Sequence, residues 1–219
     1  MPRETRTQRA KRALRIVRAL AQAYPDASCA LHFDTPFQLL VATILSAQCT
    51  DQKVNEVTQV LFRRYGTPRA LAEADPAEIE AIVRPTGFYR QKTKSILATA
   101  QELVAKHAGA VPKTMEELTA LRGVARKTAN VVLGTAYGIP GIAVDTHMAR
   151  VNQRLRLTES DDPVKIERDL MALVPESEWT QYTHRVIHHG RVCCTARAPR
   201  CETCPLRRDC PWPTSRKRA

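Results

Sequence analysis

The sequence has no long run of apolar residues. Its longest stretch of leucine and β-branched character extends only over residues 39–45, far short of the ~18 to 20 residues that a helix needs to span a bilayer. The arginine-rich amino end runs directly into an amphipathic pattern, without the apolar segment and small-residue cleavage site of a secretory signal. We therefore expect no membrane helix and a location in the cytosol.

Strand-like patterns, internal repeats and low-complexity tracts are also missing. Apolar residues recur at helical spacing through most of the chain, which predicts an all-α fold. Asp51 is expected to cap the third helix. The longer helices are predicted around residues 14–21, 37–45, 51–61, 89–107, 114–121, 126–137, 145–157, 163–173 and 179–192, with short helices between residues 66 and 87.

The middle of the chain has almost no net charge. In total, 34 Lys and Arg against 22 Asp and Glu leave a net charge of +12. Residues 1–18 hold seven basic and one acidic side chain, residues 185–219 hold nine and two, and the residues between them sum to −1. The excess indicates a polyanionic partner. Because both ends share this basic composition, we expect residues 1–28 plus 140–219 to form one lobe and residues 29–139 another.

Four of the seven cysteines lie close together near the carboxyl end. The segment reads Cys194-x6-Cys201-x2-Cys204-x5-Cys210. Reducing thiol pools in the cytosol keep disulfides open, so the cluster suggests a metal. Structural zinc sites usually bring two close cysteine pairs from separate strands, whereas one close pair flanked by wider spacings favours a [4Fe–4S] cluster. Four unligated thiols would be prone to oxidation.

The other cysteines are interpreted separately. Cys193 is an alternative first ligand because it precedes Cys194, whereas Cys29 and Cys49 are interpreted as small buried hydrophobic residues. Arginines near the cysteine segment can balance the negative charge of a cluster held by four thiolates. They are Arg191, Arg197, Arg200, Arg207 and Arg208.

A glycine-containing turn stands between two helical patterns at residues 121–129, which read Leu-Arg-Gly-Val-Ala-Arg-Lys-Thr-Ala. Such a turn can point backbone N–H groups and the positive end of a helix at a phosphate. Lys127 is either one more phosphate contact or a nucleophile, because the helix start and Arg126 both disfavour its protonated form. The residues expected to contact phosphate here are Arg122, Gly123, Val124, Ala125 and Arg126.

Asp145 follows an apolar segment and precedes a helical pattern. It is either an ordinary N-cap or a partly buried carboxylate that stabilises a cation or moves a proton, and the local sequence does not decide between them. Among the histidines, only His184 and His188 have a spacing that could bring two ligands together on a helix. We interpret these two, together with His147 and His189, as structural.

Three features resemble those of endonuclease III, in the family of helix-hairpin-helix DNA glycosylases. They are the turn leading to Lys127, the sequence Val-Asp-Thr-His at residues 144–147, and the four-cysteine segment. Further similar stretches are Ser-Ala-Gln-Cys-Thr-Asp at 46–51, Gly-Phe-Tyr at 87–89 and Lys-Thr-Ala-Asn-Val-Val-Leu at 127–133. The resemblance extends over nearly the whole chain, from about Ala13 to Pro211.

The resemblance implies a base-excision repair enzyme that removes oxidised pyrimidines, such as thymine glycol, from duplex DNA. Lys127 would attack C1′ of the damaged nucleotide, displace the base and form a Schiff base, after which β-elimination would cleave the strand 3′ to the abasic site. Asp145 would stabilise positive charge on the sugar and move protons. The implied fold has two helical lobes with DNA in the groove between them, so that Lys127 and Asp145 approach from opposite sides.

The family also implies particular partners and ligands. Residues 29–139 would form a six-helix barrel with the helix-hairpin-helix motif, and the other lobe would hold a [4Fe–4S] cluster on Cys194, Cys201, Cys204 and Cys210. The DNA substrate contains damaged pyrimidines or abasic sites, which places the protein at the nucleoid. No apolar seam indicates oligomerisation, so we expect a monomer.

The damaged nucleotide must leave the base stack before it reacts. Gln48 and Phe88 match the family's positions for filling the vacated space and for wedging the duplex. Phe88 could instead be a core aromatic, but its position in a turn followed by Arg90, Lys92 and Lys94 favours an exposed wedge.

The sequence differs from the family pattern at three positions. The hairpin of the family usually reads Leu-Pro-Gly-Val-Gly, whereas Arg122 and Ala125 replace the proline and the second glycine here, and Ala198 stands where a lysine is expected. If position 125 requires a positive φ, alanine would cost roughly 1 to 2 kcal/mol there. We therefore predict that the altered hairpin lowers DNA affinity or shifts the damage preference, and that activity is reduced.

Two other functions fit parts of the pattern. An adenine glycosylase shares the fold but generally lacks the nucleophilic lysine, whereas Lys127 is present here. A DNA-binding or redox-sensing iron–sulfur protein on the same scaffold would keep the cluster and the hairpin with little or no catalytic activity.

Overall fold

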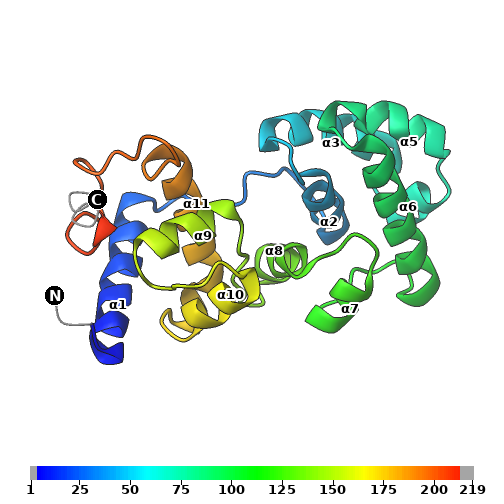
Figure 1. Cartoon of the computed structure of the whole chain (residues 1–219). Helices are drawn as coiled ribbons and strands as arrows, with labels where there is room; N and C mark the ends of the chain where they lie inside the picture. Colours follow the sequence, from blue (N-terminus) through cyan, green and yellow to red (C-terminus); the bar gives the residue numbers. More distant parts are fainter. Residues whose placement is uncertain (1–3, 213–219) are drawn as a thin grey trace. The chain divides into compact units, whose positions relative to one another are not determined.

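The computed structural model describes residues 4–212, and within this range the chain forms helices, turns and loops without a β-strand (Figure 1). The all-α prediction is therefore confirmed. The described chain divides into two compact units by its internal contacts. One unit is the continuous segment Cys29–Ile139, and the other combines the residues up to Ser28 with those from Pro140 onward. None of the described helices is both long enough and apolar enough to cross a bilayer.

The Cys29–Ile139 unit is built around one apolar helix, α2. Every residue of α2 from Leu39 to Leu45 is buried, as is Phe37, because this helix contacts α3, α6 and α8 on different sides. A helix that is apolar all round can be stable only in such a central position. The helices of this unit are α2 (Pro36–Leu45), α3 (Asp51–Tyr65), α4 (Pro68–Ala72), α5 (Pro76–Val83), the 3₁₀ turn η1 (Arg84–Thr86), α6 (Tyr89–Lys106), α7 (Met115–Ala120) and α8 (Arg126–Tyr137).

Threonine marks the start of most helices in this unit. The hydroxyl of Thr35 accepts a hydrogen bond from the backbone N–H of Gln38, and Pro36 then occupies the first helical position, where its missing N–H costs nothing. Helix α3 is capped in the same way, but its cap lies one residue before the predicted Asp51. Thr50, rather than Asp51, is the N-cap of α3, because its extended backbone lets the hydroxyl accept from the N–H of Lys53.

The second unit combines an amino-terminal helix with the carboxy-terminal part of the chain. One face of α1, carrying Ala13, Ile16, Val17 and Leu20, is buried in a core that the later helices complete. Within this core α1 contacts α11, and α11 contacts α9. The helices are α1 (Arg6–Ala23), α9 (Thr146–Arg154), α10 (Pro163–Met171), the 3₁₀ turn η2 (Glu176–Glu178) and α11 (Trp179–Val192).

A buried polar pair lies at the centre of this second core. Tyr182 is fully buried, and its hydroxyl donates a hydrogen bond to Oδ1 of Asn152. The amide nitrogen of Asn152 in turn donates to the carbonyl of Met148, at 2.9 Å. Each buried polar atom of the pair named here has a partner, which is the condition under which such a pair does not destabilise a core.

Replacing Tyr182 by phenylalanine is expected to reduce the free energy of unfolding by about 1 to 3 kcal/mol, since Oδ1 of Asn152 would remain buried without a donor. Urea denaturation of the cluster-containing protein measures the change. Tyr89→Phe is the matched control, because the ring of the half-buried Tyr89 packs against the core and two arginines and phenylalanine keeps that ring, so its change should stay within about 0.5 kcal/mol. Equal losses in the two variants would contradict the role of the pair.

Candidate functional site

The glycine turn of the sequence forms a hairpin between α7 and α8. Gly123 has a φ of +80°, and the backbone N–H of Val124 bonds the carbonyl of Leu121 at 3.2 Å. Helix α6 contacts this turn, because the hydroxyl of Thr99 donates a hydrogen bond to the carbonyl of Arg122 at 2.7 Å. A Cβ on residue 123 would lie 2.8 Å from the Cβ of Ser95. Both the φ and the close packing therefore require glycine at 123.

Ala125 is not strained, which corrects the expectation of a costly alanine in the hairpin. Its φ of −85° and ψ of 166° are ordinary extended values that any L-residue adopts. The positive φ of this hairpin belongs to Gly123 alone. The predicted loss of DNA affinity therefore has no basis in backbone strain at position 125.

Two helices of the Cys29–Ile139 unit begin without a side-chain cap. A Thr or Asp side chain accepts a hydrogen bond at the start of α2, α3, α4, α5 and α7, whereas no side chain does so for α6 or α8. These two helices follow Phe88 and Ala125, at the two turns predicted to contact DNA. An uncapped N-terminus carries a positive partial charge and unpaired N–H donors, which suit a phosphate.

Lys127 lies in the first turn of α8 and is half-buried. Its ammonium forms no hydrogen bond or ion pair with any residue that the structure describes. This lysine therefore has no structural task in the unit, and its amine is available for chemistry or for a ligand.

Asp145 is the N-cap of α9, in the other unit. One carboxylate oxygen accepts the backbone N–H of Met148 at 2.7 Å. The side chain is half-buried and follows the buried residues Ile142, Ala143 and Val144. The N-cap interpretation is thus confirmed, and the same bond fixes the orientation of a carboxylate that keeps a second oxygen.

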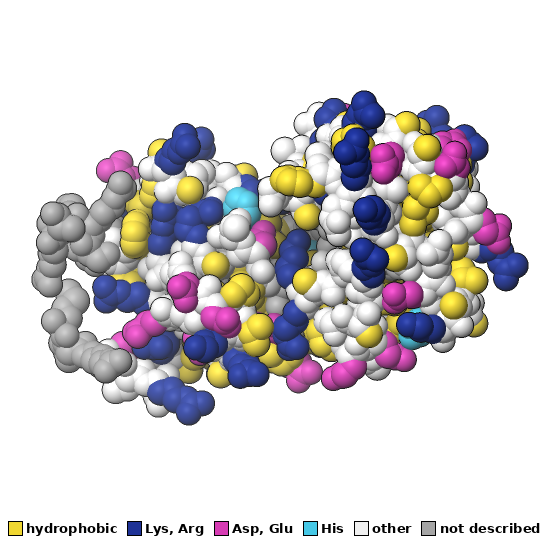
Figure 2. Space-filling view, turned by 45° about the vertical axis from the view of Figure 1, so that its right-hand side comes forward, with side chains coloured by type: hydrophobic (Ala, Val, Ile, Leu, Met, Phe, Trp, Pro, Cys, Tyr) yellow, Lys and Arg dark blue, Asp and Glu magenta, His cyan; other side chains and the backbone are white. Residues whose placement is uncertain are grey.

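Gln48 and Phe88 both occupy tight turns with left-handed backbones. Their φ values are +52° and +48°, both side chains are exposed, and Phe88 is 67% exposed. This exposure excludes the core interpretation of Phe88. On the face shown in Figure 2, Lys and Arg side chains lie over both units among acidic and apolar ones. Lys92 is not part of that basic surface, because it is buried.

The carboxy-terminal cysteines line one cavity in the unit that contains α9 and α11. Apolar and basic side chains complete the wall, including Leu155, Leu206 and Arg154. The guanidinium of Arg154 donates to Sγ of Cys194 at 3.3 Å, the kind of bond that stabilises a thiolate ligand. The cysteines that line the cavity are Cys193, Cys194, Cys201, Cys204 and Cys210.

Among the described residues, the close group of potential metal ligands is His189, Cys193 and Cys204, whose ligand atoms lie within 4.8 Å of one another. Of the four motif cysteines, this group contains Cys204. All four motif cysteines line the same cavity, and four cysteine thiolates are the donor set that holds a [4Fe–4S] cluster.

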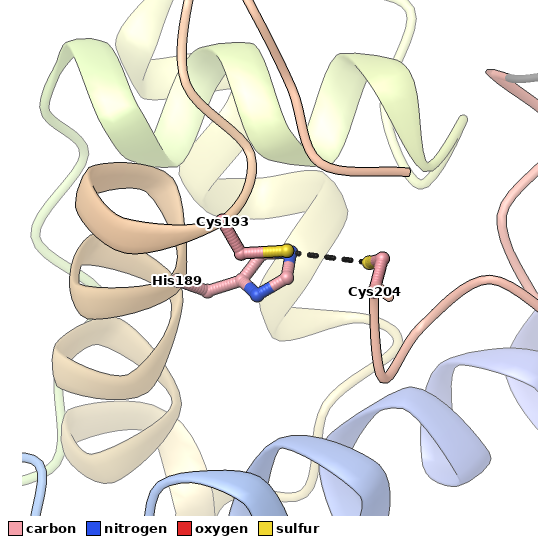
Figure 3. A group of neighbouring side chains, drawn as sticks. All are labelled: His189, Cys193 and Cys204. Carbon is pink, nitrogen blue, oxygen red and sulfur yellow. Dashed lines mark hydrogen bonds between the residues drawn. The ribbon is translucent and has the colours of Figure 1, made fainter. Parts of the chain in front are cut away.

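His189 supports the cluster loop from α11 (Figure 3). Its Nε2 lies 3.7 Å from Sγ of Cys204, and the hydroxyl of Tyr24 lies 2.9 Å from its Nδ1. Burial lowers the pKa of His189 to about 4 and raises the pKa of Tyr24 to about 12. Tyr24 can therefore donate to a neutral imidazole, whose other N–H points at Cys204. The interpretation of His189 as a structural residue stays a prediction, and its position beside Cys204 agrees with a role in supporting the cluster loop.

Sequence reasoning missed the arginines of α9 that hold the cluster loop. Arg150 donates to the carbonyls of Gly190 and Cys194, and Arg154 to the carbonyls of Thr195 and Ala196. Their i, i+4 spacing places both on one helix face. That spacing, downstream of Asp145, was the available signal, but it does not show which segment the face contacts.

Comparisons with known proteins agree with this geometry. Residues 41–176 match the HhH-GPD superfamily of base excision DNA repair proteins, and residues 194–210 match the iron–sulfur binding domain of endonuclease III. The chain is 52% identical to Endonuclease III of Synechocystis sp., over 92% of each chain. It is 40% identical to Endonuclease III of Escherichia coli, over 93% of this chain and 96% of that one. The chain belongs to the endonuclease III family.

Solved structures of endonuclease III extend the match to the fold. A non-covalent endonuclease III–DNA complex has a TM-score of 0.91 at 42% identity, covering 96% of this chain and 99% of that one. A trapped endonuclease III–DNA covalent intermediate has a TM-score of 0.90 at 41% identity, covering 95% and 98%. This member of the endonuclease III family is accordingly a DNA glycosylase and abasic-site lyase that binds DNA and carries a [4Fe–4S] cluster.

Gly123→Ala is expected to raise the Kd for a duplex with an abasic-site analogue about tenfold, since a non-glycine residue at positive φ costs roughly 1 to 2 kcal/mol. Ala125→Gly should leave the Kd within about twofold, because position 125 is unstrained. Fluorescence anisotropy at one fixed salt concentration measures both values. Tighter binding by Ala125→Gly would restore the strain hypothesis.

Proposed function

We propose that Lys127 is the nucleophile of this glycosylase and lyase, and that it acts on oxidised pyrimidines such as thymine glycol in duplex DNA. The observation that carries the assignment is the half-buried Lys127 without a structural partner, at the start of an uncapped helix. Nucleophilic attack requires an amine that no other group of the protein holds, and Lys127 meets this requirement among the described residues.

The proposed reaction proceeds through the lysine nitrogen. Nζ of Lys127 forms a bond to C1′, and the bond from C1′ to the base breaks, so that the base leaves with the electron pair and takes up a proton. Opening of the sugar ring gives a Schiff base between Nζ and C1′. Loss of a proton from C2′ then breaks the bond from C3′ to its oxygen, which cleaves the strand 3′ to the abasic site.

We assign Asp145 the accompanying electrostatic and proton-transfer role. Its capping bond to Met148 holds one oxygen in place and leaves the other to face positive charge on the sugar or to carry protons. The hairpin residues Arg122 to Arg126 bind phosphate in this proposal, and Gln48 and Phe88 occupy the space that the extruded nucleotide leaves.

The proposed cluster ligands are those of the matched segment. The match to the iron–sulfur domain begins at residue 194 and ends at residue 210, which supports Cys194 rather than Cys193 as the first ligand. Arg154 also donates to the sulfur of Cys194, whereas Sγ of Cys193 faces the carbonyl of Arg200 at 3.7 Å. When bound, the cluster supplies metal–sulfur bonds that close the loop and a redox-active centre. The ligands are then Cys194, Cys201, Cys204 and Cys210.

Borohydride reduction should trap the wild-type enzyme covalently on duplexes that contain thymine glycol or an abasic site, since it reduces a Schiff base to a stable amine. Lys127→Ala should form no adduct, and the exposed Lys106→Ala is expected to behave like wild type. Denaturing electrophoresis separates the adduct from free protein. If the wild type binds DNA but forms no adduct, the protein is instead a non-catalytic iron–sulfur DNA-binding protein.

Cys194→Ala should abolish cluster assembly, whereas Cys193→Ala should retain it, because only the first is a proposed ligand. Iron and sulfide content per chain, together with the visible absorption band of the cluster, measure the outcome. The reverse result would make Cys193 the ligand.

A further inference from the structure

Lys92 is a buried cation that the repair reaction does not use. It lies on α6, one turn after Phe88, and is only 5% exposed. Burying an ammonium is costly, and loss of hydration accordingly lowers the pKa of Lys92. No acidic side chain among the described residues forms an ion pair with it. The buried ammonium therefore needs a hydrogen-bond acceptor that compensates for its lost hydration.

The partner is the backbone of the turn that carries Phe88. Nζ of Lys92 donates to the carbonyl of Thr86 at 2.7 Å, at the end of η1, where the negative end of a helix favours a cation. The hydroxyl of Thr86 in turn donates a hydrogen bond to the carbonyl of Val83 at 2.8 Å. On the other side, the backbone N–H of Lys92 bonds the carbonyl of Phe88 at 3.0 Å. Lys92 therefore holds this turn at two points, one on either side of Gly87.

That turn has an unfavourable backbone. Gly87 has a φ of +71° and Phe88 a φ of +48°, and an aromatic residue rarely adopts the left-handed region unless its surroundings enforce it. The side chain of Phe88 is largely exposed, so it has few contacts of its own to hold it. The conformation depends on the backbone bonds beneath it, and the ammonium of Lys92 supplies one of them.

Gln48, the other residue that we assign to the space of the extruded nucleotide, also has a left-handed backbone, with a φ of +52°. It directly precedes Cys49, whose charge would raise the pKa of Lys92 against the effect of burial.

We propose that Lys92 is a positioning residue for nucleotide extrusion, which holds the Thr86–Phe88 turn so that Phe88 can wedge a stacked duplex. This inference rests on the proposed function, because it needs Phe88 to act on DNA. A methionine would fill the same volume without the cost of a buried charge. What it would remove is the bond to Thr86, and with it the fixed geometry of the wedge.

The test compares two duplexes that differ in how difficult extrusion is. In one, thymine glycol is opposite adenine, and in the other it is opposite an abasic-site analogue, so that less pairing must be broken. Lys92→Met should slow single-turnover base release about tenfold on the paired duplex and less than about twofold on the unpaired one. Lys106→Met makes the same chemical change at the exposed end of α6 and should match wild type on both.

A double variant separates positioning from general stability. If Lys92 acts through Phe88, Lys92→Met in a Phe88→Ala background should add no further loss on the paired duplex, whereas independent effects would multiply. Lys92→Gln keeps N–H donors on a shorter side chain and should lose less than Lys92→Met on the paired duplex. It also serves as the test if Lys92→Met does not fold.

Three results would overturn the inference: an unchanged rate in the Lys92 variants, an equal loss on both duplexes, or losses that multiply with Phe88→Ala. Failure of the proposed function has a different signature, because then the wild-type enzyme would release thymine glycol from neither duplex.

Discussion

Every α-helix must leave the first N–H groups of its backbone without partners inside the helix, and something else must satisfy them. In the Cys29–Ile139 unit the helices meet this requirement in two ways. Threonine or aspartate side chains cap five helices, whereas α6 and α8, which also pack in the core around α2, differ at their starts. Helices α6 and α8 have no such cap. These two helices follow Phe88 and Ala125, and the positive end of a helix without a side-chain cap attracts an anion.

Helix α6 connects the two turns that we propose to contact DNA. Its first turn carries Lys92, which bonds the Phe88 turn, and its middle carries Ser95 and Thr99, which contact the hairpin. One helix thus fixes the separation of these two turns within the unit. In the other unit, several arginines bond the protein itself. Arg12, Arg150 and Arg154 each donate hydrogen bonds to backbone carbonyls. Net charge therefore overstates the charge that faces DNA.

The sequence predicted those features that depend on neighbouring residues. Helical periodicity and the glycine turn at 123 are local properties, and the structure confirms them. For Asp145 the sequence left an N-cap and a functional carboxylate open, and the structure shows the N-cap. The errors concern contacts between distant segments or backbone angles. Lys92 belongs to a basic stretch in the sequence but is buried by the fold, and the φ of Ala125 is set by how α8 begins. The proposed preference for Cys194 over Cys193 also draws on a distant residue, because Arg154 donates to the sulfur of Cys194 from forty residues away.

The cluster unit is discontinuous in the chain, and this has a consequence during synthesis. Its core needs the buried face of α1 together with α9, α10 and α11, and Arg12 and Arg15 of α1 bond Asp209, next to the last cysteine of the motif. The Cys29–Ile139 unit is continuous and can fold while the ribosome is still translating the carboxy-terminal helices. Helix α1 emerges first but must wait for the carboxy-terminal segment. Iron and sulfur therefore meet a completed binding loop only at the end of translation, after the hairpin that will meet DNA has already formed.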